Sequence, residues 1–432
     1  MPLLAVGVVD GAAVLGRKSA GAHPVAPSPS GRSTAQQQAS VTTAARTTAV
    51  SALLDRRSDA VLRHDAAEWH STLDPENPPF VREQMQVFRN LQQVPFAAWS
   101  YTLDPGHSRH VPHAQRYAAP VWAPAQIFLN YRIRAFDPRA TNLPQYPTFV
   151  RRGSHWLLTS FDDFAKRGNV SATDLWDFGP VSIVRTPSVL VLGHPSSLAL
   201  MRSLAAQVAG DIPRVTAVWG DAWSRRAVVL VPSTQHELGQ VVQDYGNLDA
   251  IAAVTTAEVQ IGSGRPDPVG DRVGINPANW PKLSALGQRI VLTHELTHVA
   301  TRAVTSAATP TWLAEGFADY VGYLGSGVPT GFVAEELGAA VRAGDVPGRL
   351  PAASEFNSSS RRLSQAYEGA WLACRLIAQR FGQRALVRFY AAVGRSDLSS
   401  AAAVDLAMHR LLHMSQATFV QQWRGFLRSE LS

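Results

Sequence analysis

Between Val291 and Tyr320 the chain holds residues whose types and spacing can bind a metal ion. His294 and His298 stand four residues apart in VLTHELTHVA, so on a helix both imidazoles leave the same face. A catalytic zinc takes three protein ligands and keeps one position open for water. Glu315, in the following segment TWLAEGFADY, is the natural third ligand. Glu295 lies next to the first histidine and is suited to act as the catalytic base.

Two helices are needed to position these residues. Residues 279–281 (Asn-Trp-Pro) favour a helix start ahead of the histidines, and apolar side chains then mark a face that can be buried. We expect a second helix with Thr309 as N-cap and Pro310 at its first position. The short turn at 306–308 allows the helices to pack as neighbours and brings Glu315 toward the histidine pair.

HELTH followed by WLAEGFADY resembles the gluzincin branch of zinc metallopeptidases, which includes thermolysin and related aminopeptidases. The resemblance implies His294, His298 and Glu315 as ligands of one zinc ion, and Glu295 as general base and acid. Asp319 matches the aspartate of the family's ExxxD pattern. From that position it would accept a hydrogen bond from a ligand imidazole and fix the orientation of the ring.

SQAYEGAW resembles the segment in which many of these enzymes hold a tyrosine that stabilises the oxyanion, and Tyr367 is the candidate. The alternative is a packing role, because Trp371, Leu372 and Leu376 continue an apolar helix face from Tyr367. In the same family an edge strand beside the zinc helix binds extended substrate by backbone pairing. Segments 249–259 and 271–280 are both candidates for that strand.

Composition and charge limit the remaining classes of function. The chain has 432 residues, of which 46% are hydrophobic, so it can bury a large core in two to three domains. Its net charge of +7 comes mostly from scattered arginines without a basic run, so no nucleic-acid partner is expected. Cys374 is the only cysteine and is expected at a buried helix position.

The first 40 residues are expected to lie outside the folded domains. Residues 3–16 are apolar but short, and the first basic residues follow them, as in a signal or membrane-anchor remnant whose basic start is missing. Residues 20–40 have the composition of an exposed linker. We therefore expect export or membrane anchorage and an extracytoplasmic location; the alternative is the disordered tail of a cytoplasmic protein.

Residues 41–180 are expected to form an accessory domain. Helical patterns over 47–73 and 80–94 precede alternating strands at 97–104, 125–136 and 148–162. This order vaguely resembles the cone-shaped nuclear-transport-factor-2-like fold, in which helices cover a curved antiparallel sheet. A second metal site at His107, His110 and His113 is not expected, since no acidic or cysteine partner accompanies them.

Residues 181–432 are expected to form a zincin-type metallopeptidase domain, so the chain as a whole is α+β. The β-rich runs 188–193 and 227–233 flank a helical segment at 197–212, and residues 331–432 are mostly helical in pattern. His409 and His413 share helical spacing but lack a glutamate and a third ligand. Both are expected on the surface.

The most direct interpretation is a zinc-dependent peptidase that acts on peptide or protein substrates, as an endopeptidase of the cell envelope or exterior. The related aminopeptidases grip the substrate's free amine with a GxMEN-like segment, and nothing between Asp249 and Ile275 resembles it; Glu258 is a lone acid there. Two alternatives remain: a non-catalytic binding or scaffold protein with a structural zinc site, and a latent peptidase covered by residues 41–180.

Overall fold

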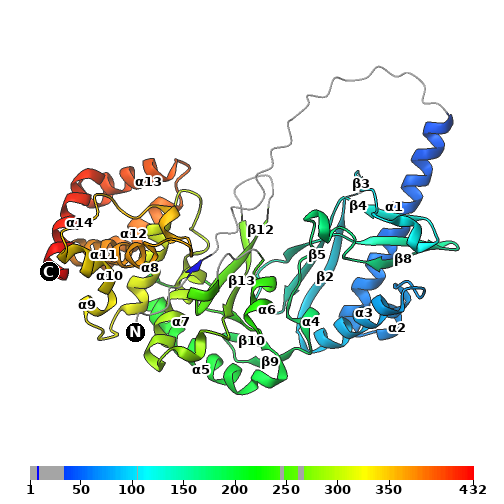
Figure 1. Cartoon of the computed structure of the whole chain (residues 1–432), viewed down its shortest axis with the longest axis horizontal. Coiled ribbons are helices and arrows are strands. Elements are labelled where there is room, and N and C mark those ends of the chain that lie inside the picture. Colours follow the sequence, from blue (N-terminus) through cyan, green and yellow to red (C-terminus); the bar gives the residue numbers. More distant parts are fainter. Residues whose placement is uncertain (1–6, 9–33, 105, 244–247, 261–266) are drawn as a thin grey trace. The chain divides into compact units, whose positions relative to one another are not determined.

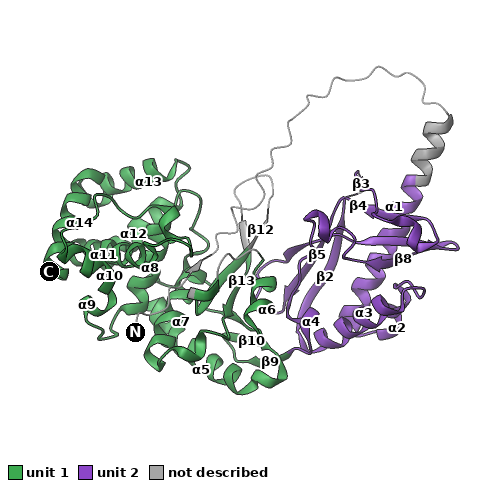
Figure 2. Ribbon diagram, viewed as in Figure 1, with its two compact units in different colours: residues 1–11, 182–432 green, residues 12–181 purple. Residues whose placement is uncertain are grey.

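A computed structural model describes residues 7–8, 34–104, 106–243, 248–260 and 267–432. The chain divides into two compact units, one of residues 12–181 and the other of residues 1–11 together with 182–432 (Figure 2). Both contain helices and strands, which agrees with a mixed α+β class (Figure 1). Apart from Gly7 and Val8, the apolar segment 3–16 lies outside the described residues, as does the expected linker up to residue 33.

The helices of residues 12–181 are short apart from the first. Helix α1 already begins at Thr34, so residues 34–40 are helical where the sequence predicts a linker. His64, in the left-handed conformation, ends this helix, and the Asp65 side chain caps the next by accepting a hydrogen bond from the Glu68 amide. The helices are α1 (Thr34–Arg63), α2 (Ala66–Ser71), α3 (Pro78–Asn90) and α4 (Leu175–Phe178).

The strands of this unit form two antiparallel sheets, where the sequence predicts one. One sheet has the order β2-β5-β6 and the other β3-β4-β7-β8. The sequence does not predict β4 and β6, because these short strands contain prolines, which are uncommon inside strands. The strands are β2 (Phe96–Leu103), β3 (Ser108–Arg109), β4 (Val121–Pro124), β5 (Ile127–Ile133), β6 (Thr141–Gln145), β7 (Thr148–Arg152) and β8 (His155–Ser160).

The other unit is built on a six-stranded mixed sheet with the order β1-β12-β13-β11-β10-β9. Strands β10 and β11 are parallel and are linked through helix α5 (Leu198–Trp219), which continues past Pro213, where the sequence predicts its end at Ile212. Helix α6 (Gln235–Val241) follows β11. The strands are β1 (Gly7–Val8), β9 (Ser182–Arg185), β10 (Val189–Gly193), β11 (Ala227–Val231), β12 (Ala253–Gln260) and β13 (Asp267–Ile275).

The rest of this unit is mostly helical, as expected. Helices α7 and α8 precede a helical group that ends with α14, and buried side chains from all three join one apolar core. Cys374 is fully buried on α11. The helices are α7 (Ala285–Thr301), α8 (Thr311–Tyr323), α9 (Thr330–Val333), α10 (Glu335–Arg342), α11 (Leu363–Phe381), α12 (Gln383–Gly394), α13 (Ser400–Ala407) and α14 (Gln416–Leu431).

Both helices of the metal motif begin later along the chain than the sequence predicts. The segment at Trp280 forms a single 3-10 turn, and α7 begins after Ser284, whose side chain accepts a hydrogen bond from the Gly287 amide. Helix α8 begins after Pro310, while the Thr309 hydroxyl accepts from the Ser306 amide in the preceding turn. Across the described part of the chain, no helix is both long and apolar enough to cross a membrane.

Helix α8 lies between α7 and α11, and two of its glycines allow both neighbours to approach. A Cβ on Gly316 would stand 2.3 Å from the carbonyl oxygen of Ala370 on α11. A Cβ on Gly322 would stand 3.0 Å from the carbonyl oxygen of Ile290 on α7. Any side chain at Gly316 therefore forces backbone to move, directly beside Glu315.

Gly316→Ala should lower the free energy of unfolding by about 1–3 kcal/mol, the usual cost of overpacking, because the obstacle is backbone and cannot rotate away. Urea denaturation measures this. The matched control is Gly210→Ala on α5, an exposed helical glycine whose added Cβ meets nothing within 4 Å. It should be neutral or stabilising by up to about 1 kcal/mol. Equal effects of the two variants would refute the close-approach argument.

Candidate metal centre

Helix α7 carries two imidazoles that meet inside the protein. His294 and His298 are buried, and their Nε2 atoms lie 2.9 Å apart. The four-residue spacing places them one turn apart on a single helix face, as the sequence predicts. Two imidazole nitrogens directed at each other in a buried place leave lone pairs that a single cation can receive.

Glu315 on α8 completes a group of three ligand atoms. Its Oε2 lies 3.3 Å from Nε2 of His294 and 3.7 Å from Nε2 of His298. Ligands at about 2.0–2.1 Å in a tetrahedral zinc site are separated from one another by roughly 3.3 Å. The three observed separations of 2.9, 3.3 and 3.7 Å bracket that value.

Two buried oxygen atoms at this place have no hydrogen-bond partner among the described residues: Oε2 of Glu315 and Oε1 of Glu295. A buried carboxylate oxygen is normally hydrogen-bonded, so each unpaired one needs an explanation such as an ion or a water molecule. A zinc ion bound by His294, His298 and Glu315 satisfies the first atom. The donor set of two imidazoles and one carboxylate therefore fits zinc.

Asp319 lies one helical turn after Glu315 and contacts the far side of a ligand ring. Its Oδ1 is 2.8 Å from Nδ1 of His294. A carboxylate there accepts the Nδ1–H and leaves the Nε2 lone pair directed at the ligand group. This is the contact that the ExxxD resemblance implies.

Glu295 is held from a strand of the sheet. The hydroxyl of Thr255 on β12 donates a hydrogen bond to Oε2 of Glu295 and lies 3.2 Å from its backbone carbonyl oxygen. The carboxylate is thereby held through Oε2, while Oε1 has no hydrogen-bond partner among the described residues. Thr255 is a residue that the sequence analysis missed, because nothing in the motif points to a partner forty positions earlier.

Burial and neighbouring charges move the pKa values of this cluster apart. Burial raises the pKa of Glu295 to about 7, although His294 and the Thr255 hydroxyl oppose it. Burial would also raise the pKa of Glu315, but His298 and His294 outweigh it and hold it at about 2. Burial lowers the pKa of His298 to about 4. For His294, by contrast, Asp319 and Glu315 outweigh burial and raise the pKa to about 10.

Tyr367 lies on α11, one turn before the Ala370 that touches Gly316 of α8. Its side chain is half-buried, and its ring packs edge-on against Phe356 at 5.1 Å. The helix that carries it is thus adjacent to the one that carries Glu315. These contacts are compatible with both roles considered for Tyr367.

The other histidines singled out in the sequence are surface residues. His107, His110, His113, His409 and His413 are exposed. Within the described residues, His294, His298 and Glu315 are the one group of three potential ligands close enough to share an ion.

No protein-family model matches the chain, and no curated protein matches it. Its structure is similar to a two-domain M1 zinc metallopeptidase variant bound to L-tryptophan, with 15% identity, a TM-score of 0.34, and coverage of 65% of this chain and 59% of that one. Two M1 zinc metallopeptidase structures from Deinococcus radiodurans give similar values. A variant bound to a Tyr-Ser-Ala substrate has 14% identity and a TM-score of 0.33, with coverage of 65% of this chain and 59% of that one. The enzyme itself has 15% identity and a TM-score of 0.33, with coverage of 65% and 58%.

The chain thus spans less than two thirds of the length of these structures. The comparisons give no support to the cone-fold resemblance of residues 41–180. The assignment of the metal centre rests on its own residues.

The purified chain should contain one zinc ion per molecule, measured by elemental analysis. His294→Ala and Glu315→Ala should each lose it, because two ligands rarely hold a catalytic zinc. Asp319→Asn should keep the three ligands but weaken zinc binding by roughly tenfold to a hundredfold. His409→Ala, an exposed histidine, serves as control. Full zinc occupancy in both ligand variants would show that the ligands lie elsewhere.

Proposed function

We propose that this protein is a zinc-dependent peptidase. The observation that carries the proposal is the arrangement of His294, His298 and Glu315 as a ligand group beside a buried glutamate, Glu295, that is not part of it. A structural zinc site has a closed shell of ligands and needs no adjacent base. A hydrolytic site needs that base.

When bound, zinc supplies an acidified water, with a pKa near 7, and polarises the carbonyl that the water attacks. Glu295 takes up the proton of the water at Oε1 and delivers it to the leaving amine. A carboxylate beside a metal-bound water can serve first as general base and then as general acid. Thr255 keeps the carboxylate from rotating, since it holds Oε2.

Strand β12 is the best candidate for the strand that binds substrate. It carries Thr255, the direct neighbour of Glu295, and of the two candidate segments it makes the more extensive contact with α7. Its outer edge accepts extended backbone: β1 pairs with it in parallel, with Gly7 opposite Val254 and Val8 opposite Thr255. A substrate that pairs at the same positions has to displace β1.

We further infer that the enzyme is an endopeptidase that acts outside the cytoplasm. The first inference rests on the lack of a GxMEN-like amine-binding segment between residues 249 and 275, and the second on the apolar segment 3–16. A scaffold protein with a structural zinc is the rival from another class. Latency through residues 41–180 is a separate hypothesis about regulation of the same site.

Glu295→Gln should keep zinc and fold but reduce peptide hydrolysis at least about a hundredfold, because the amide cannot take up the proton. Turnover of a peptide library, zinc content and melting temperature are measured together. Glu335→Gln on α10 is a control for the chemical change. A wild-type chain that binds zinc, loses stability on chelation and hydrolyses no peptide would instead favour the scaffold function.

Tyr367→Phe separates the two roles of Tyr367. If the hydroxyl stabilises the oxyanion, turnover falls about a hundredfold and the melting temperature hardly changes. If the ring only packs, Tyr367→Phe leaves turnover near normal and only Tyr367→Ala is harmful, with a cost up to about 3 kcal/mol since the ring is half-buried. We expect the first result, and normal turnover of the Phe variant would remove Tyr367 from the site.

A further inference from the structure

The unit of residues 12–181 encloses a cavity of about 220 Å³ between its helices and the sheet β2-β5-β6. Helices α1, α3 and α4 and strands β2, β5 and β6 all contribute side chains to its wall. The volume is below the roughly 300–1,000 Å³ of pockets for drug-sized molecules, so its ligand must be small. None of its residues belongs to the metal centre.

A buried arginine lines this cavity. Arg57 on α1 is 2% exposed, donates hydrogen bonds to Tyr101, Thr72 and Gln84, and stacks on Trp69 with 3.3 Å between the guanidinium carbon and the ring centroid. All three acceptors are neutral. No carboxylate of the described residues lies within ion-pair distance of Arg57. Buried charges are normally paired with an opposite charge. Arg57 feels the charge of the Asp177 carboxylate, another residue of the cavity wall, but that carboxylate lies beyond ion-pair distance, so the guanidinium has no carboxylate in direct contact.

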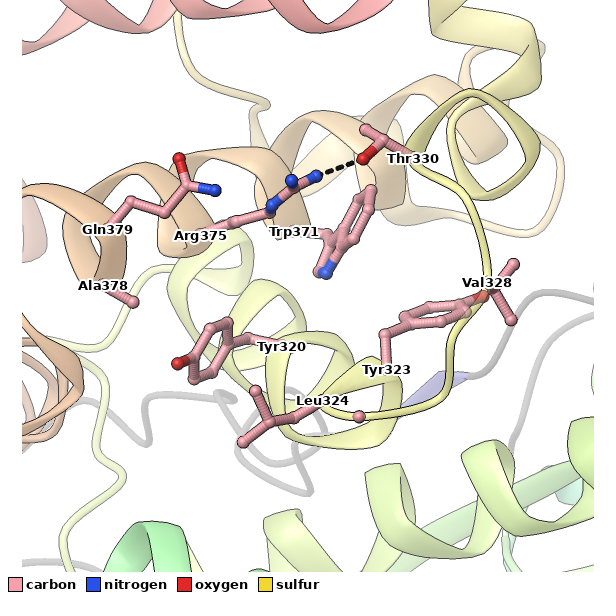
Figure 3. Close-up of a pocket in the computed structure, with 10 residues that line it drawn as sticks. Tyr320, Tyr323, Leu324, Val328, Thr330, Trp371, Arg375, Ala378 and Gln379 are labelled. Carbon is pink, nitrogen blue, oxygen red and sulfur yellow. Dashed lines mark hydrogen bonds between the residues drawn. The ribbon is translucent and has the colours of Figure 1, made fainter.

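The cavity of the other unit makes the contrast clear. It measures about 310 Å³ and is lined by aromatic side chains and Arg375 (Figure 3). There the arginine lies near Trp371 and bonds to Thr330, but it is also paired with Glu430 at 3.1 Å. Glu430 therefore balances the charge of Arg375, and this cavity needs no anionic ligand to do so.

Three carboxylates line the first cavity. Glu83 and Asp162 are exposed residues that line the cavity near the exposed Phe178, and Asp177 lines it with a carboxyl group that accepts a hydrogen bond from the Asp174 amide and whose pKa burial raises to about 7. Among the described residues, none of the three has a cationic partner within ion-pair distance. Burial and Asp162 raise the pKa of Glu83, which indicates that these carboxylates repel each other. A cation at the opening would relieve that repulsion.

The cavity wall has apolar parts beside polar side chains such as Gln84 and Gln145. It contains buried aromatic and aliphatic side chains, which are Trp99, Trp176, Leu129 and Leu143. The cavity thus offers a positive charge inside, apolar parts of its wall, and negative charge at the opening. A matching ligand carries an anionic group, an apolar body and a cationic group.

We propose that this cavity binds a free amino acid with an apolar or aromatic side chain, its carboxylate directed to Arg57 and its ammonium group to Glu83 and Asp162. Such a zwitterion has both charges within a small volume and an apolar body for the wall. Aromatic rings beside the opening also attract the ammonium group. The proposal does not depend on the metal centre.

The test is titration calorimetry of the full-length protein with L-phenylalanine and two analogues that each lack one charge, N-acetyl-L-phenylalanine and L-phenylalanine amide. L-Phenylalanine should bind with a stoichiometry of one, and each analogue should bind at least about tenfold more weakly. Glu83→Gln, on the exposed rim and compatible with folding, should weaken binding at least about fivefold. Asp59→Asn, an exposed acid on α1 outside the cavity, should have no effect.

Arg57→Lys probes the inner end of the cavity, because lysine keeps the charge but loses the planar donor pattern. It should weaken L-phenylalanine at least tenfold while leaving the amide analogue unaffected. The proposal is overturned if no heat of binding appears at millimolar concentration, or if an analogue binds as well as the zwitterion. It is also overturned if binding survives Glu83→Gln and disappears on zinc chelation, since the amino acid would then bind at the metal centre.

Discussion

The structure of residues 182–432 depends on holding five ionisable side chains in an apolar core. His294, His298, Glu295, Glu315 and Asp319 are all nearly inaccessible, and burying even one isolated charge is expensive. The cost is reduced because the groups face one another: each carboxylate except Glu295 contacts an imidazole. A divalent cation bound by the imidazoles and Glu315 would complete this compensation. The cluster is therefore arranged for a metal and would be hard to explain without one.

Packing around helix α8 follows from this constraint. Ligands from two helices meet only if the helices approach closely. Gly322 lets α8 approach α7, and Gly316 lets it approach α11. The sheet contributes through β12, from which the Thr255 hydroxyl donates a hydrogen bond to Glu295. Packing and the proposed chemistry are thus linked, because Gly316, which lets α11 approach, directly follows the proposed metal ligand Glu315.

Sequence alone was informative where chemistry depends on local spacing. The separation of His294 and His298 defines one helix face, and Glu315 and Asp319 share another, so both the ligand group and the contact of Asp319 could be anticipated. Helix ends were less predictable: Ser284 rather than Asn279 caps α7, and Pro310 precedes α8 instead of opening it. The contact of Thr255 with Glu295 and the neutral hydrogen-bond partners of Arg57 could not be predicted, because both depend on residues far apart in the chain. Pro213 led to a helix that was predicted too short, because α5 continues past this proline to Trp219.

The burial of the ligand atoms has a kinetic consequence. His294, His298 and Glu315 are at most 4% exposed and lie on helices packed against their neighbours. A chelator could occupy the position open to water and substrate, but it could not replace these three protein ligands while α7 and α8 stay packed. Metal exchange then waits for a transient separation of α7 and α8, a local opening of the native state. At high chelator concentration the rate of metal loss would level off at the rate of that opening. Exchange of zinc would thus report on the motion of the helices as much as on the affinity of the site.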